Sequence, residues 1–390
     1  MQSTSNGSIQ KNLNLHVRLN MIVRDEAHTI EAALESARPI IDSFCIVDTG
    51  SQDDTISLIK KWGEIHGIYG QVHQSTWVNF GHNRTEALSF ATSDNSASHV
   101  LFLDADDRIV VEPSFEKSSL KSSTSYRLDY LLGGIHYTLP GLISVGENRC
   151  WRWQGALHEF LESVRHHPTF ESLGKVRVMK NVVKGGRSIG LSQRDKYLKD
   201  AAILENELSL DPENSRNTFY LAQSYRDAGD QESAHRWYVR RAGMPGWDQE
   251  TYHSMLEAAK CLERLDRVDE ALSQYFNAWE FRRLRRCALY HCVRIFRIRR
   301  SFGLGLHLSQ LAYSCPDYTN DSLFIDQSIY DWKLDDETSI CAYWEGKYEY
   351  SVELCERILS RNDIPEIARE RVEKNRAFSM QRLSEKDSEL

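Results

Sequence analysis

A short apolar run that leads straight into three carboxylates constrains this chain more than any other feature of its sequence. Val100 to Leu103 are apolar and too few for a helix, so they predict a strand covered on both faces. Asp104, Asp106 and Asp107 follow at once. Ligands of open α/β sheets bind at strand ends, and carboxylates gathered there repel one another unless a cation lies between them. The pattern favours a Mg2+ or Mn2+ site, because these cations take oxygen ligands and share them with phosphates; a solvated turn is the alternative.

The composition of the 390 residues is that of a globular protein with two or three domains. The net charge of -8 argues against nucleic acid as the main partner. No apolar run approaches the roughly 20 residues that span a bilayer, and residues 1–14 are polar, so we expect a disordered arm there rather than a signal peptide. The eight cysteines lack a metal-binding spacing, which favours reduced thiols in a cytoplasmic protein.

Strand and helix patterns alternate through the first part of the chain. Strands are expected at residues 15–23, 44–47, 70–73 and 100–103, and helices at 27–37, 55–62 and 85–91. Thr29 is the expected N-cap of the first helix. This alternation predicts an α/β domain over residues 15–192, with a Rossmann-like, mixed and mostly parallel sheet.

Helical patterns with few strand signals fill the rest of the chain. Residues 219–238 and 255–275 repeat small and aromatic positions some 35 residues apart, and residues 342–351 suggest a third copy. The period predicts an all-α domain of tetratricopeptide-like (TPR-like) repeats over residues 193–385. Residues 281–316 are degenerate, so the number of repeats stays open. The concave face of such a stack is expected to present an acceptor or to form a homodimer.

A run of basic residues lies within the degenerate stretch. It comprises Arg282, Arg283, Arg285, Arg286, Arg294, Arg297, Arg299 and Arg300. We interpret the run as a solvated helix face. The alternative is a surface that docks an acidic acceptor or makes the protein peripheral at a membrane.

Acidic residues also follow the first two predicted strands. Glu26 comes after the first strand and Asp48 after the second. Because the carboxyl ends of parallel strands meet at one edge of a sheet, these acids should lie near Asp104. Such an edge suits a nucleotide, since acids accept hydrogen bonds from ribose hydroxyls and base N–H groups while a metal takes the diphosphate.

Five segments together resemble the ordered motifs of family-2 glycosyltransferases of the GT-A fold. They are residues 21–26, 46–55, 77–88, 101–107 and 151–159. The resemblance covers about residues 15–190 and implies a metal-dependent, inverting hexosyltransferase with a nucleotide-diphosphate sugar as donor. A UDP-sugar is the family's default, although the acids do not exclude another base. The acceptor would be a glycan, a lipid-linked sugar or a protein or peptide, and the layout is similar to that of peptide S-glycosyltransferases.

The resemblance implies roles for the residues that match the nucleotide-binding motifs. Glu26 and Asp48 would hold the base and the ribose. Arg84 would lie near the base or the diphosphate. Asn83 precedes Arg84, whereas the family usually has an asparagine after the arginine, where this chain has Thr85. Which of Asn83 and Arg84 faces the nucleotide therefore stays open.

The resemblance also implies a metal shell and a general base. Asp106 would ligate the metal, Asp104 would help through the ribose or a water molecule, and His158 would complete the shell or touch the diphosphate. Glu159 is the first choice for the base that activates the acceptor, and Asp107 is the second. The structural alternative for His158 and Glu159 is the start of a helix with a capping acid.

Two other functional classes share some of these features with a glycosyltransferase. A catalytically inactive interaction scaffold would keep the repeats and a relic nucleotide-binding domain, but all the strand-end acids are present together. A nucleotidyltransferase needs a glycine-rich loop after the first strand, and residues 21–29 contain no glycine.

Overall fold

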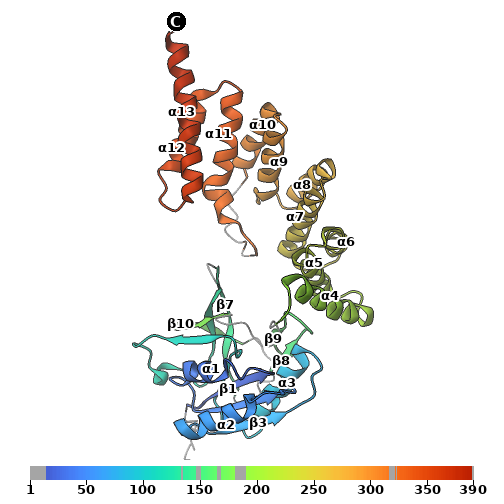
Figure 1. The fold of residues 1–390 in the computed structure, drawn as a ribbon, viewed down its shortest axis with the longest axis vertical. Helices are drawn as coiled ribbons and strands as arrows, with labels where there is room; N and C mark the ends of the chain where they lie inside the picture. The colour runs from blue at the N-terminus through green and yellow to red at the C-terminus, as the bar shows by residue number, and fades with distance from the viewer. Residues whose placement is uncertain are drawn as a thin grey trace, which may run out of the picture. The chain divides into compact units, whose positions relative to one another are not determined.

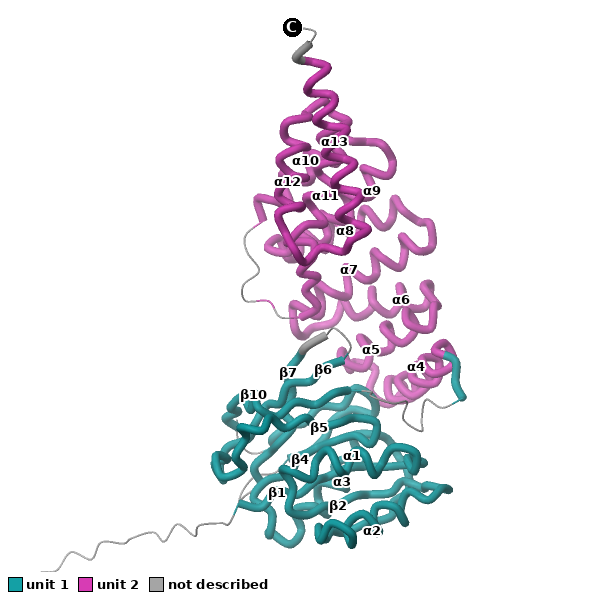
Figure 2. The backbone as a smooth tube through the Cα atoms, turned by 60° about the vertical axis from the view of Figure 1, so that its left-hand side comes forward, with its two compact units in different colours: residues 1–192 teal, residues 193–390 magenta. Residues whose placement is uncertain are grey.

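The chain folds into two compact units, Met1–Ser192 and Gln193–Leu390, which Figure 2 colours separately. The computed structural model describes residues 15–132, 135–145, 151–164, 168–180, 190–315, 321 and 323–388. The predicted arm at residues 1–14 lies outside the described residues. Among the described helices, none combines the length and the apolar character needed to cross a membrane.

A mixed sheet in the order β3-β2-β1-β4-β7-β6-β10-β5 forms the centre of the first unit (Figure 1). Its strands are β1 (Val17–Val23), β2 (Ser43–Asp48), β3 (Gly70–Gln74), β4 (His99–Phe102), β5 (Arg108–Val111), β6 (Ser125–Leu132), β7 (Ile135–Ser144) and β10 (Phe170–Met179). The neighbours β3, β2, β1 and β4 are parallel, and so are β6 and β10. Strand β7 is antiparallel to both β4 and β6, and β5 is antiparallel to β10. The prediction of a mixed sheet is confirmed.

Helices cover both faces of this sheet, as the alternation of side chains along β1 requires. The helices are α1 (Ile30–Ala37), α2 (Thr55–His66) and α3 (Phe80–Thr92). Leu19 and Met21 pack with α1 and α2 in one apolar cluster. Asn20 points to the other face, where its amide donates to the carbonyls of Cys45 and of Ala87 in α3, at 2.9 and 3.0 Å. Strands β1, β2 and β4 are therefore buried on both sides, and their carboxyl ends are left for a site.

The expected elements of the first part of the chain are present within a few residues of their predicted bounds. Helix α3 extends further than predicted, because Asn79 caps its start by accepting the His82 N–H at 2.8 Å. Thr29 occupies the N-cap position of α1, but its side chain makes no capping bond. Its hydroxyl instead donates to the Ala105 carbonyl at 3.2 Å and accepts from Arg108 at 2.6 Å. Thr29 thus ties α1 to the turn that follows β4.

A hairpin of β8 (Trp151–Gln154) and β9 (Phe160–Ser163) packs against α3. The Thr85 hydroxyl donates to the Trp153 carbonyl at 3.1 Å and accepts the Trp153 N–H at 2.8 Å. The Gly81 N–H donates to the Gly155 carbonyl at 3.0 Å. His158 and Glu159 lie in the turn between the two strands, so the interpretation of this pair as a helix start is wrong.

The contact between Gly81 and Gly155 leads to a prediction about stability. A Cβ atom on Gly81 would lie 2.5 Å from the Gly155 carbonyl oxygen, so Gly81→Ala must push the hairpin away from α3. We expect a loss of about 1–3 kcal/mol in the free energy of unfolding, although alanine favours helices. Urea denaturation measures the loss. Gly174→Ala is the control, because a Cβ there meets nothing within 4 Å. An equal loss in both variants would contradict the packing argument.

Antiparallel helices make up the second unit (Figure 1). They are α4 (Gln193–Leu210), α5 (Ser215–Asp227), α6 (Gln231–Ala242), α7 (Asp248–Arg264), α8 (Val268–Phe281), α9 (Cys287–Ile298), α10 (Phe302–Tyr313), α11 (Leu334–Trp344), α12 (Tyr348–Leu359) and α13 (Glu366–Ser388), with a short π-helix η3 (Ile329–Lys333) before α11. The predicted all-α repeat domain is confirmed, and the degenerate stretch at residues 281–316 contains the regular helix pair α9 and α10.

Four helix-helix turns of this unit share one backbone geometry. The turns after α5, α7, α9 and α11 each place one residue in the left-handed region: Gly229, Asp266, Arg300 and Gly346. In each turn the next N–H donates across the turn to a carbonyl five residues earlier, as from Asp230 to Tyr225 and from Ser301 to Phe296, both at 2.9 Å. This is the bond of a Schellman motif. The repeat therefore continues through α9 and α10, where Arg300 replaces the glycine that would have signalled it.

The basic run in α8–α10 is mostly paired, so the interpretation as a solvated face is wrong for much of it. Arg285 is fully buried, pairs with Asp321 at 3.2 Å and lies over the Tyr252 ring. Arg297 pairs with Glu337 at 2.6 Å. Further ion pairs join Arg282 to Asp321, Arg283 to Glu280, Arg294 to Glu263 and Arg299 to Asp269. Arg294 and Arg297 thus link α9 to α7 and to α11.

The cysteines that the structure describes are all free and buried, and Cys150 lies outside the described residues. Burial raises the pKa of the Cys45 thiol to about 11 and that of Cys261 to about 12. Neutral, buried thiols of this kind are inert.

Candidate functional site

The loops after β1 and β2 are joined at the carboxyl edge of the sheet. The Asp25 N–H donates to the Ser51 hydroxyl at 2.9 Å, and the Asp25 carboxylate accepts the Gln52 N–H at 2.7 Å. The Glu26 N–H donates to the Thr55 hydroxyl at 2.8 Å. Glu26 and Asp48, the acids predicted to hold a nucleotide, therefore belong to one fixed pair of loops.

Asp48 ends β2 and is fully buried. Its Oδ1 accepts the N–H groups of Gly50 and Ser51, both at 3.0 Å. Its Oδ2 is buried and has no hydrogen-bond partner among the described residues. A buried polar atom without a partner costs stability, so Oδ2 is an acceptor that a ligand could satisfy.

The turn after β4 brings three carboxylates together. Ligand oxygens of Asp104, Asp106 and Asp107 all lie within 4.8 Å of one another. The Asp107 N–H donates to the Asp104 carbonyl at 3.1 Å and closes the turn. Arg108 donates to the carbonyls of Ala105 and Asp107, at 3.0 and 2.6 Å, and so holds the backbone of the turn in place. We call Asp104, Asp106 and Asp107 the acid turn.

Arg84 of α3 connects the acid turn to the β8–β9 hairpin. Its Nη2 donates to Asp104 Oδ1 at 2.6 Å, and its Nε donates to Glu159 Oε1 at 2.7 Å. The guanidinium also lies over the Trp153 ring, 5.3 Å from the ring centroid. Only 10% of the Arg84 side chain is exposed. Arg84 therefore holds the predicted base Glu159 beside the predicted metal-binding acids.

Lys180 is a member of this cluster that the sequence reasoning missed. Its Nζ donates to Asp104 Oδ2 at 3.1 Å and to Asp107 Oδ2 at 2.5 Å. Lys180 directly follows β10, and its backbone N–H donates to the Leu131 carbonyl at 2.8 Å. A strand assignment over residues 170–179 would have pointed to it as another charged residue at a strand end.

The pKa values of these groups reflect their mutual charges. Burial works against ionisation of Asp104, yet the Arg84 and Lys180 charges hold the pKa of its carboxyl well below the usual range. Burial also opposes the charge of Lys180, but Asp104 and Asp107 raise the pKa of its ammonium well above the usual value. Burial and the neighbouring Asp104 charge raise the pKa of Asp106. Asp106 is thus the acid of the turn whose negative charge is least compensated.

Asn83 and His158 lie outside this cluster. The Asn83 side chain is buried, accepts the Val78 N–H at 2.9 Å and donates to the Thr76 carbonyl at 3.0 Å. It holds the loop before α3, while Arg84 points to the acids. His158 is exposed, has a positive φ of 52°, and is not a member of the metal-ligand group found among the described residues.

The acid turn has the donor chemistry that a hard divalent cation requires. All its side-chain ligands are oxygens, which suit Mg2+ and Mn2+. Acids outnumber cations among the described groups of the cluster, which are Asp104, Asp106, Asp107 and Glu159 against Arg84, Arg108 and Lys180. Asp106 makes no ion pair with a described residue, so it is the ligand most open to a metal.

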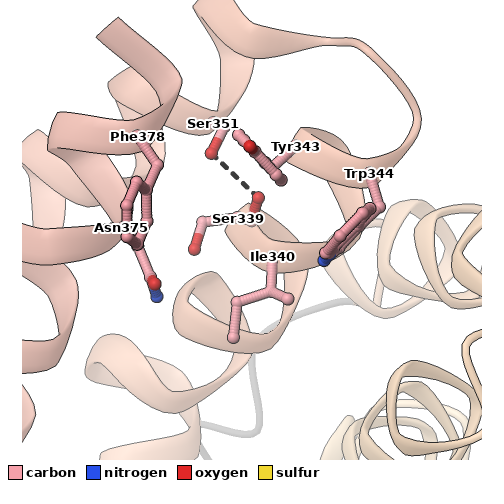
Figure 3. Close-up of a pocket in the computed structure, with 7 residues that line it drawn as sticks. All are labelled: Ser339, Ile340, Tyr343, Trp344, Ser351, Asn375 and Phe378. Atoms are coloured by element: carbon pink, nitrogen blue, oxygen red, sulfur yellow. Dashed lines mark hydrogen bonds between the residues drawn. The ribbon is translucent and has the colours of Figure 1, made fainter. Parts of the chain in front are cut away.

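A separate cavity of about 280 Å3 lies in the repeat unit, between α11, α12 and α13 (Figure 3). It is lined by Ser339, Ile340, Tyr343, Trp344, Ser351, Asn375 and Phe378. The Ser351 hydroxyl donates to the Ser339 carbonyl at 2.9 Å. Trp344 and Phe378 are more than half exposed at its rim. The described residues that line this cavity are uncharged, and four of the seven are aliphatic or aromatic.

The sequence of the first unit matches a known family. Residues 20–117 match the family model described as glycosyl transferase family 2. The N-terminal unit carries a glycosyl transferase family 2 domain. That segment contains the second half of β1, the strands β2–β5 and the helices between them, including Glu26, Asp48, Arg84 and the acid turn. The predicted combination of such a domain with TPR-like repeats is confirmed.

The curated relatives include a glycosyltransferase and a TPR repeat-containing protein. The SPbeta prophage-derived glycosyltransferase SunS of Bacillus subtilis is 20% identical over 216 residues, which cover 53% of this chain and 48% of SunS. A TPR repeat-containing protein of Synechococcus elongatus is 33% identical over 97 residues, which cover 25% of this chain and 22% of that protein. The chain thus spans about half or less of the length of these relatives.

Solved TPR-protein structures also resemble this chain at a low level. A crystal structure of MamA has a TM-score of 0.34 at 12% identity and covers 44% of this chain and 95% of its own. YrrB, described as a TPR protein with an unusual peptide-binding site, has a TM-score of 0.35 at 12% identity and covers 46% of this chain and 84% of its own.

Proposed function

We propose that the chain is a metal-dependent, inverting glycosyltransferase that takes a sugar from a nucleotide-diphosphate sugar. One observation carries the proposal: Arg84 joins Asp104, at the end of β4, to Glu159, within a unit that carries a glycosyl transferase family 2 domain. The donor that the family resemblance implies is a UDP-sugar. The acceptor is proposed to be a glycan, a lipid-linked sugar or a protein or peptide.

The nucleotide is proposed to bind between the loops after β1 and β2. Asp48 Oδ2 is a buried acceptor that a base N–H or a ribose hydroxyl would satisfy. Glu26 lies on the adjoining loop, which Thr55 and Ser51 hold in place. These loops would fix the nucleotide so that its diphosphate reaches the acid turn.

The acid turn is proposed to hold the divalent cation through Asp106, with Asp104 beside it. A bound cation would stabilise the negative charge that develops on the leaving diphosphate as a Lewis acid. Arg84 and Lys180 lie against the same carboxylates and supply further positive charge near that leaving group.

Glu159 is proposed to be the general base. Arg84 holds its Oε1, which orients the carboxylate and leaves Oε2 to accept the proton of an acceptor hydroxyl or thiol. The side chain is 16% exposed, whereas Asp107 is 2% exposed and its Oδ2 is held by Lys180. Attack from the side of Glu159, with the diphosphate leaving on the other, would invert the anomeric carbon in one displacement.

The repeat unit is proposed to bind the acceptor or a second copy of the chain. The cavity in Figure 3, with exposed Trp344 and Phe378 at its rim, is the site that we propose for an acceptor segment. Light scattering of the purified protein tests the homodimer.

A donor screen combined with one substitution tests the proposed function. We expect one nucleotide-diphosphate sugar to raise the melting temperature in the presence of Mn2+, because bound ligand stabilises the folded state. Asp106→Asn should abolish the Mn2+-dependent part of this shift. It should also lower hydrolysis of that donor by about 100-fold, the scale on which losing one electrostatic stabiliser acts. Glu112→Gln, which alters an exposed pair with Arg177, is the control.

Two results would count against this proposal. Asp106→Asn with unchanged Mn2+ dependence would refute the metal assignment. Failure of every nucleotide-diphosphate sugar to bind would instead favour the scaffold with a relic domain.

A further inference from the structure

The Lys180 ammonium lies against Asp104, which is also proposed to help Asp106 hold the cation. Its ammonium lies between Asp104 Oδ2 and Asp107 Oδ2, at 3.1 and 2.5 Å. Asp107 is nearly fully buried, and 20% of the Lys180 side chain is exposed. A divalent cation that uses the same oxygens must displace the ammonium, because two cations repel each other at so short a range.

We propose that Lys180 is an exchangeable counter-ion of the acid turn. It neutralises Asp104 and Asp107 when no metal is bound, and it competes with a divalent cation for the carboxylate of Asp104. This proposal rests on the proposed function, because that function supplies the cation. It adds a residue that controls when the cation binds.

Lys180 and Arg84 differ in how easily they can move. Arg84 makes two directed ion pairs, with Asp104 and Glu159, and packs on Trp153, so its position is fixed from three sides. Lys180 carries a point charge on a flexible four-carbon stem. Its described ion pairs both go to the acid turn. Of the two cations, Lys180 is therefore the one that can withdraw without dismantling the site.

Exchange has a consequence for the order of binding. If the Lys180 ammonium occupies the acid turn in about nine-tenths of the molecules, only about one-tenth can bind metal directly. The apparent affinity for metal is then about tenfold lower. The diphosphate of a donor would offer the displaced ammonium a new anionic partner. Metal and diphosphate would therefore strengthen each other's binding, and this coupling must be reciprocal. The acid turn would bind free metal weakly and metal with donor tightly.

Amine labelling of the wild-type protein tests the displacement directly. An acetylating reagent is applied with and without Mn2+, whose binding is followed by electron paramagnetic resonance. We expect Mn2+ to raise the labelling of Lys180 about tenfold, because the fraction of molecules with a free ammonium would rise from about one-tenth to nearly one. Lys175 is an internal control: it lies on β10 and donates to the Ser114 carbonyl, away from the acid turn. Equal labelling of Lys180 with Mn2+ bound would overturn the proposal.

Lys180→Met gives a second measurement that does not depend on activity. We expect this variant to bind Mn2+ alone about tenfold more tightly than the wild type, whereas Lys175→Met should not. Lys180→Arg keeps a cation at the site and should bind Mn2+ as weakly as the wild type. Unchanged or weaker binding in Lys180→Met, with Mn2+ still bound, refutes the exchange but leaves the proposed function standing. Absence of Mn2+ binding in both proteins refutes the exchange and the metal dependence together.

Discussion

Arg84→Met is expected to lower the melting temperature of the N-terminal unit by about 6–12 °C and to abolish sugar transfer. The substitution leaves Asp104 and Glu159 without the guanidinium that Arg84 places between them at 2.6 and 2.7 Å. Breaking a buried ion pair from one side costs about 3–5 kcal/mol, and we expect the lower end because Lys180 still pairs with Asp104. In a domain of this size, about 3 kcal/mol corresponds to that shift. Scanning calorimetry measures it.

The pH dependence of this loss separates lost charge pairing from lost packing. In the wild type the pKa of Asp104 is lowered in the folded state, so the pairing stabilises the protein above the unfolded pKa of about 3.9 and its contribution falls away as the pH drops. The gap between wild type and Arg84→Met should therefore be widest near neutral pH and narrow below about pH 4. A constant gap would indicate packing alone. Arg152→Met, which breaks an exposed pair with Glu162, should cost at most about 1 kcal/mol.

The first part of the fold could be predicted from sequence because its signals are local. The strands at β1, β2 and β4 are short apolar runs, and each helix between them starts near a capping residue. The later strands are harder to see. Strand β10, for example, exposes more than half of its residues and contains a register shift near Ser172. Its apolar side chains therefore do not alternate regularly, and the sheet partners that specify it lie far away in the sequence.

The site residues likewise differ in how well the sequence predicts them. Glu26, Asp48 and the acid turn stand directly after apolar strands, so their meeting at one edge follows from parallel pairing. The position of Glu159 needed the family resemblance, because its distance from the acid turn is set by the docking of the β8–β9 hairpin on Thr85 and Gly81. Lys180 was not predicted as a site residue, because it follows β10 and the sequence pattern of β10 does not indicate a strand.

For the basic run at residues 282–300, the sequence predicted exposure where the structure has ion pairs. Composition suggested a solvated face, since eight arginines within twenty residues are hard to bury. The structure pairs six of them with acids, which include Glu263 and Glu337 on neighbouring helices. Those acids lie 31 and 40 residues from their partners in the sequence. An analysis of short sequence segments therefore does not reveal these ion pairs.

Glu159→Gln is expected to lower the turnover of the donor by about 100- to 10,000-fold, the range that general-base catalysis contributes. Glutamine keeps the shape of glutamate and can still accept a hydrogen bond from Arg84, so the pocket should keep its affinity for the nucleotide. The expected pattern is a loss in kcat with little change in KM, as for an interaction made only in the transition state. The rate at which water hydrolyses the donor measures the loss in turnover. Calorimetric titration with the nucleotide diphosphate measures the affinity for the nucleotide.

Asp107→Asn separates the two acids predicted as the base. Asp107 is held by Lys180 and is 2% exposed, so its neutralisation should cost stability and release Lys180 rather than remove a proton acceptor. We expect this variant to melt earlier and to keep far more turnover, at a temperature where it is folded, than Glu159→Gln. If Asp107→Asn loses turnover on the larger scale while Glu159→Gln retains it, the base is in the acid turn. The pair of Arg84 and Glu159 would then serve to close the β8–β9 hairpin over the donor.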